Sequence, residues 1–121
     1  MITVRNLVTL MLRKFLALGC VIVSVGALSA CAKADAPNKL TLTNHKFFPE
    51  VIHVKANQPN QILFVNNDAT AEEFDSSSLK VEKVVGGHGQ GVVRLRALAP
   101  GKYPFMGEYH ADTAQGFVVA E

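Results

Sequence analysis

Apolar and polar residues alternate along most of the chain after residue 38. Leucine and threonine alternate over 40–43, and related two-residue periods occur over 62–65, 93–96 and 117–119. Alternation of this kind is typical of strands that bury one face. The runs are separated by turn-forming residues, which include Asn57 with Pro59, Asn66-Asn67-Asp68, Gly86-Gly87 and Pro100-Gly101. Short strands at this spacing predict an all-β antiparallel sandwich of roughly seven or eight strands, with no helix and no internal repeat.

The first thirty residues follow a different pattern. Basic residues at Arg5, Arg13 and Lys14 precede an uncharged apolar run over 15–30, and small residues surround Cys31. This layout is typical of a secretory signal peptide. As a helix the apolar run would be roughly 24 Å long, which is shorter than the ~30 Å hydrocarbon core of a membrane. A cleaved signal is therefore favoured over a permanent span.

The cleavage site resembles the bacterial lipobox, because Leu28-Ser29-Ala30 precedes Cys31. The resemblance implies that Cys31 is acylated and that the protein is periplasmic and anchored to a membrane by lipid. Ordinary cleavage within 32–36, giving a free periplasmic protein, is the alternative. We expect a lipoprotein-type signal peptide over 1–30, a tether over 31–37 and one domain over 38–121.

Removal of the signal changes the charge and the thiol content. The whole chain carries a net charge of +2, but three of its twelve basic residues and none of its ten acidic residues lie in 1–30. The remaining chain is slightly acidic and has no basic cluster or aromatic platform, so a nucleic-acid partner is not expected. Acylation of Cys31 and loss of Cys20 would leave the domain with no free thiol.

A motif near the end of the chain, YPFMGEYHADTAQG over 103–116, suggests metal chemistry. Tyr103, Phe105 and His110 fit the Y-x-F-x-C-x-x-H-x-x-x-x-M run of small copper proteins, but Gly107 stands at the cysteine position and Gln115 at the methionine position. With Phe48-Pro49 and Ile62-x-Phe64-x-Asn66, this motif resembles the cupredoxin family. The resemblance implies a Greek-key β-sandwich.

A narrower resemblance covers essentially residues 38–121. The segments NHKFFPE, NNDATAEEFDSSSLKVEKV and GEYHADTAQG are similar to the cupredoxin-like components of bacterial iron-uptake systems, of the FtrB and EfeO types. By this resemblance the protein would bind copper and/or iron ions. It would also work with an inner-membrane iron permease and other uptake components.

The positions of the copper ligands show what the family template has lost here. In the family template, the first histidine ligand comes six positions after the first asparagine at an Asn-rich strand end. Counted from Asn66, that position is Glu72 here. Of the four ligand positions only His110 is unchanged. The soft sulfur donors that favour copper redox cycling are absent from this set.

Oxygen donors gather at the same predicted end of the sandwich. Glu72, Glu73, Glu108 and His110 belong to the two segments that converge there, and His45 lies in the first loop. Carboxylates with imidazoles suit Fe(II), Fe(III), Mn(II) or Cu(II) better than Cu(I). Crowded carboxylates also need a cation or a proton to offset them. The sequence thus predicts a metal site without thiolate.

Several of these residues have a second interpretation. Met106 is a thioether ligand if the strand end turns, but alternation places it on the opposite face from Phe105. Gly107 either leaves room for an ion or provides a turn with positive φ. Glu72 and Glu73 also fit a solvated acidic loop, and His45 fits a simple loop hydrogen bond. His53 and His88 are expected at the surface.

The function we expect is that of a periplasmic metal-binding protein of a ferrous-iron uptake system, which assists Fe(II) oxidation or delivers iron to a permease. Copper-dependent ferrous oxidase activity is one form of this hypothesis. A non-redox copper or metal chaperone is an alternative from the same residues. A metal-free β-sandwich that only binds protein partners is the other, because a fold does not fix a function.

Overall fold

The computed structural model describes residues 37–121. The predicted signal segment 1–30, the acylation site Cys31 and the tether up to residue 36 lie outside the described residues. Within residues 37–121, no helix is long and apolar enough to cross a membrane. The described chain forms strands and one short 3₁₀ turn, η1 (Glu108–His110), which confirms the predicted all-β fold class. The strands are β1 (Asn38–Thr43), β2 (Lys46–Phe48), β3 (Val51–Val54), β4 (Asn60–Asn66), β5 (Glu72–Ser76), β6 (Val81–Val85), β7 (Gln90–Leu95), β8 (Gly101–Gly107) and β9 (Gln115–Ala120).

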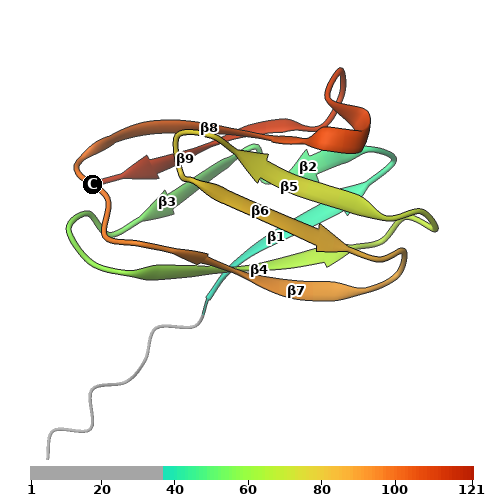
Figure 1. Ribbon diagram of the computed structural model, residues 1–121, viewed down its shortest axis with the longest axis horizontal. Coiled ribbons are helices and arrows are strands. Elements are labelled where there is room, and N and C mark those ends of the chain that lie inside the picture. Colours follow the sequence, from blue (N-terminus) through green and yellow to red (C-terminus); the bar gives the residue numbers. More distant parts are fainter. Residues whose placement is uncertain (1–36) are drawn as a thin grey trace, which may run out of the picture. The chain divides into compact units, whose positions relative to one another are not determined.

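Two sheets pack face to face as a sandwich (Figure 1). The first has the strand order β2-β1-β4-β7 and the second β3-β9-β8-β5-β6. Most pairs are antiparallel, as the sequence predicts, but β1 pairs with β4 and β3 pairs with β9 in parallel. The difference arises because β3 joins the second sheet instead of returning beside β2. This leaves β1 free to pair with β4, which runs in the same direction.

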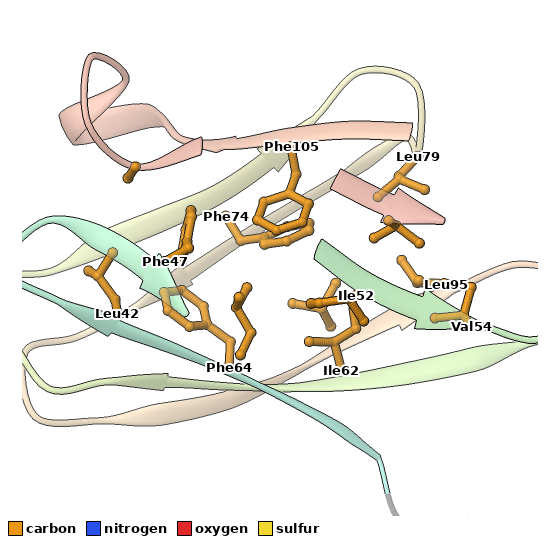
Figure 2. Close-up of a cluster of buried hydrophobic side chains, with 14 of the residues drawn as sticks. Leu42, Phe47, Ile52, Val54, Ile62, Phe64, Phe74, Leu79, Leu95 and Phe105 are labelled. Carbon is orange, nitrogen blue, oxygen red and sulfur yellow. The ribbon is translucent and has the colours of Figure 1, made fainter. Parts of the chain in front are cut away.

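The core between the sheets is rich in phenylalanine (Figure 2). The Phe47 ring meets Phe64 edge-on at 5.7 Å and Phe105 at 5.3 Å, and Phe105 stacks on Phe74 at 4.8 Å. Full burial of a side chain of this size stabilises a fold by about 1.5–3 kcal/mol. The alternation seen in the sequence is the cause, since inward residues such as Leu40 are fully buried while their neighbours face outward.

Three of these phenylalanines lie close to strand ends that carry candidate site residues. Phe47, Phe74 and Phe105 are each two positions from a residue at one end of the sandwich, namely His45, Glu72 and Gly107 respectively. Along a strand, residues two apart share a face. In β5 and β8 this relation places Glu72 and Gly107 on the inner face, at the edge of the core.

Candidate metal centre

His45 lies at the tip of a tight hairpin. Strands β1 and β2 pair up to Thr43 and Lys46, so the connection consists of two residues, Asn44 and His45. Both have positive φ, 52° and 56°. Two-residue hairpins with positive φ at both positions have the twist that suits antiparallel strands, and asparagine tolerates this region well. The turn therefore holds His45 at one end of the sandwich, within the loop that the sequence predicts.

Glu72 is the first residue of β5 and its carboxylate is fully buried. One oxygen, Oε1, accepts hydrogen bonds from the backbone N–H groups of Tyr109 at 2.9 Å and Glu73 at 3.1 Å. The other, Oε2, lies 2.6 Å from Nδ1 of His110. A buried carboxylate is tolerated only with such partners. The interpretation of Glu72 as part of a solvated acidic loop is therefore wrong.

His110 completes the group from the third segment. It ends the η1 turn that follows β8, and its ring stacks on that of His45 with centroids 3.6 Å apart and planes 13° apart. His45, Glu72 and His110 each offer one ligand atom, and these atoms all lie within 4.8 Å of one another. In Figure 1 the β1–β2 turn, the start of β5 and η1 lie at the same end of the sandwich.

Asp68 supports this arrangement from the loop between β4 and β5. Its carboxylate accepts the backbone N–H groups of Asn44 at 2.7 Å and His45 at 2.9 Å, so it fixes the hairpin turn. Burial by itself would raise the pKa of Asp68. The two backbone hydrogen bonds, with the nearby rings of His45 and His110, outweigh burial and hold the pKa below its ordinary value.

The sequence predicts only a turn at Asp68. The one available signal was an acidic residue two positions after the end of a strand, at Asn66. This signal is weak, because aspartate is common in turns of every kind. The role of Asp68 depends on a contact with a hairpin more than twenty positions earlier, which local pattern does not reveal.

One buried atom at the site lacks a partner. Nδ1 of His45 lies 3.3 Å from Oδ2 of Asp68, within ion-pair distance, yet the two are not aligned for a hydrogen bond and Nδ1 has no other partner. Buried polar atoms are usually satisfied, so this one points to a missing contact. A metal ion fits the need, because two imidazoles and a carboxylate are ligands of Fe(II), Cu(II) and Zn(II).

Gly107 occupies the position where the copper-protein template has cysteine. Its φ of −86° and ψ of 107° are extended, so the alternative of a turn with positive φ is wrong. A Cβ built on Gly107 would lie 2.8 Å from Cδ of Glu72 and 2.8 Å from Cβ of Ala114. The space that the sequence led us to expect for an ion is therefore filled by the Glu72 carboxylate and by Ala114.

The other predicted ligands lie outside the group of three. Glu73 follows Glu72 along β5, so it points to the opposite face of the sheet, where its charge acts on Tyr109. Met106 is exposed on the outer face of β8, opposite Asp75. Gln115, which was not a predicted ligand but stands at the methionine position of the motif, donates from Nε2 to the carbonyl of Ala111 at 2.8 Å. Alternation separates these side chains from the buried site.

Glu108 also lies on the outer side, among other carboxylates. The charge of Asp75 raises the pKa of Glu108 above its ordinary value, and partial desolvation, Glu73 and Glu82 add to the effect. Desolvation likewise raises the pKa of Tyr109, and the charge of Glu73 adds to it. Of the other histidines, His53 is exposed beside Glu121 and His88 is exposed in the turn between β6 and β7.

Comparison with known proteins agrees with the fold. The sequence profile of the cupredoxin-like domain matches residues 14–120. An uncharacterized protein of Rickettsia prowazekii (strain Madrid E) is 41% identical over 81 residues, which is 67% of this chain and 65% of that protein. The chain thus matches slightly less than two thirds of the length of that relative.

Solved structures of amicyanin share the fold. A reduced Cu(I) form of a proline-to-glycine mutant has a TM-score of 0.58 at 19% identity, covering 73% of this chain and 85% of amicyanin. The Cu(I) structure of a methionine-to-alanine mutant has a TM-score of 0.58 at 20% identity over the same shares of the two chains. At these identities the likeness establishes the fold alone.

Proposed function

Because this chain belongs to the cupredoxin-like domain family, we propose that it is a metal-binding protein whose site is formed by His45, Glu72 and His110. The observation that carries the proposal is the meeting of these three side chains at one end of the sandwich. The buried Nδ1 of His45, which has no hydrogen-bond partner, supports it, since buried polar atoms usually have one.

The donor set suggests which ions would bind. Two imidazoles and one carboxylate suit Cu(II) and iron, while the soft ligands that favour Cu(I) are absent from the group. Copper is the first choice, since copper is named in the structures of amicyanin that share the fold. Iron is the second, because two histidines and one carboxylate are a common donor set of non-haem Fe(II) proteins.

We extend the proposal to a role in ferrous-iron uptake, as the sequence resemblance implies. Bound copper would supply a one-electron acceptor, so that oxidation of one Fe(II) to Fe(III) reduces one Cu(II) to Cu(I). The residues would hold the ion, and if iron occupied the site, the buried carboxylate of Glu72 would favour Fe(III) over Fe(II) and so ease its oxidation. Delivery of iron to an inner-membrane permease is the alternative form of this role. The periplasmic, lipid-anchored location belongs to the same proposal and rests on residues 1–31.

The test has two steps, with matched variants. Metal-free protein is titrated with Cu(II) and with Fe(II). Glu72→Gln is compared with Glu73→Gln, because the side chain of Glu73 is next in sequence but faces away from the site. We expect the first variant alone to weaken binding. Loss of Fe(II) is then followed with copper-loaded and copper-free protein, and faster loss with copper supports oxidation.

The remaining outcomes identify the other hypotheses. Tight binding without faster Fe(II) loss would contradict the oxidase form and favour a carrier or chaperone. Absence of retained metal, with no effect of Glu72→Gln, would contradict the metal site. It would favour the β-sandwich as a module for protein contacts.

A further inference from the structure

Gly107 lies at the end of β8, beside the carboxylate of Glu72. A Cβ at this position would be 2.8 Å from Cδ and 3.0 Å from Oε1 of Glu72. Such separations are shorter than van der Waals contact. The backbone of Gly107 is extended and suits any residue, so conformational freedom does not explain the glycine. What requires a glycine here is the space taken by its neighbours.

Those neighbours have little freedom to move. The carboxylate of Glu72 is fully buried and is held by the N–H groups of Glu73 and Tyr109 and by His110. On the other side, Ala114 is fully buried, and its carbonyl accepts the N–H of Gly107 at 2.8 Å. A side chain at 107 would therefore displace the Glu72 carboxylate or separate two bonded backbone segments.

We propose that Gly107 determines the metal preference of the site by reserving the space of an oxygen ligand, an inference that rests on the function proposed above. A side chain at 107 and the buried carboxylate of Glu72 exclude each other. The chain can thus present a carboxylate from β5 or a thiolate from β8, but not both in these positions. Gly107 acts through Glu72 and is a positioning residue, not a ligand.

A matched control exists in the same chain. A Cβ on Gly86, in the turn between β6 and β7, would have no atom within 4 Å, and the φ of Gly86 is not positive. Gly86→Ala therefore adds the same methyl group without a clash. Any general effect of replacing glycine by alanine appears in both variants, and the effect of the lost space appears only at 107.

The first experiment compares Gly107→Ala with Gly86→Ala in the full chain. We expect Gly107→Ala to weaken Cu(II) binding by about 10-fold or more, as for loss of other ligand-supporting contacts. Without metal, the amide protons of Glu73 and Tyr109 should exchange faster, because their shared acceptor has moved. Gly86→Ala should change neither. A folded Gly107→Ala variant with unchanged exchange at both amides would overturn the inference, even if the protein bound no metal at all.

The second experiment tests whether a side chain at 107 and the Glu72 carboxylate exclude each other. The stability cost of Gly107→Ala is compared in the natural chain and in Glu72→Ala, where the blocking carboxylate is gone. We expect a smaller cost in the second background, and an equal cost would contradict the proposal. If Gly107→Ala alone does not fold, the same comparison is made with Ala114→Gly present in both backgrounds, because Cβ of Ala114 also lies 2.8 Å from the new methyl group and is not removed by Glu72→Ala.

A spectroscopic experiment tests whether a thiolate at 107 binds copper only when the Glu72 carboxylate is absent. With Cys20 and Cys31 both replaced by serine, Gly107→Cys is compared with Gly107→Cys/Glu72→Ala after addition of Cu(II). We expect the intense thiolate-to-copper absorption only in the double variant. The same absorption in Gly107→Cys, with Glu72 still buried and bonded to Tyr109, would overturn the proposal. Absence of Cu(II) binding in the natural chain would instead count against the proposed function, while the exchange and stability measurements would still test Gly107.

Discussion

Glu72 and His110 are 38 positions apart in the sequence, yet Oε2 of the glutamate and Nδ1 of the histidine lie 2.6 Å apart. This contact links the start of β5 to the η1 turn after β8, and the stack of His110 on His45 adds the β1–β2 hairpin. Three chain segments are thus joined through ionisable side chains at the edge of a phenylalanine core. This arrangement is the one that the proposed metal site requires.

The contribution of His45 is tested by His45→Ala, with His53→Ala as the control. His45 has the unpartnered buried Nδ1, whereas His53 is exposed and bonded to Glu121 at the surface. We expect His45→Ala to weaken Cu(II) binding by more than the roughly 10- to 100-fold typical of losing a supporting contact. His53→Ala should bind as the natural chain does. Isothermal titration measures both, and equal affinities for the two variants would contradict the assignment.

Glu72→Gln should affect stability as well as binding. The amide oxygen can still accept the N–H groups of Glu73 and Tyr109, so the fold should persist. The charged contact with His110 is lost, and a buried hydrogen bond to a charged group contributes about 1.5–3 kcal/mol. We expect the free energy of unfolding of the metal-free protein to fall by about this amount in urea titrations. Unchanged stability would mean that the Glu72–His110 contact contributes nothing in solution.

Asp68→Asn tests the support of the hairpin. An amide presents one acceptor oxygen to the two N–H groups of Asn44 and His45, and its NH₂ group faces a donor. We expect the free energy of unfolding to fall by about 1–3 kcal/mol and metal affinity to fall by about 10- to 100-fold. The control is Asn67→Ala, which removes only an exposed hydrogen bond to Thr43. Equal metal affinity of the two variants would exclude a positioning role for Asp68.

Glu108→Gln should stabilise the protein. The pKa of Glu108 is raised in the folded state, with Asp75 as the first cause, so ionisation of Glu108 costs folding free energy at neutral pH. The variant should therefore have a higher urea midpoint than the natural chain at pH 7. The difference should vanish below the ordinary pKa of 4.5, where the natural side chain is protonated in both states. It should also shrink in high salt, because Glu108 is exposed.

A lower midpoint for Glu108→Gln at pH 7 would contradict this electrostatic account. It would mean that the charge of Glu108 is compensated by a partner, such as a bound cation, in the protein as measured. Repeating the titration after removal of metal ions by a chelator separates these two explanations.

The fold was predictable because apolar and polar residues alternate along most strands. Leu40, Ile62, Phe64 and Val93 are inward residues of two-residue periods, and all are buried as expected. The parallel pairing of β1 with β4 was not predictable in the same way. It depends on β3 crossing to the other sheet, and alternation indicates which face of a strand is buried but not which strand lies beside it.

The candidate site was likewise predictable only in part. Glu72 and His110 were found through their slots on the family motif and His45 through its place in the first loop, but both Glu72 and its neighbour Glu73 were predicted as ligands. The pleat of β5 separates the two, because it buries one and turns the other outward. Asp68 was missed because its partners lie in a distant hairpin. The occupation of the space at Gly107 by a carboxylate likewise depends on packing between β5 and β8.

The most direct test of the account is the position of the metal itself. Crystals of the protein grown with Cu(II) should give an anomalous scattering peak within bonding distance of His45, Glu72 and His110, with no sulfur atom among the ligands. A peak among Glu73, Asp75, Glu82 and Glu108 on the outer face, or no peak between the three proposed ligands at full copper loading, would contradict the account.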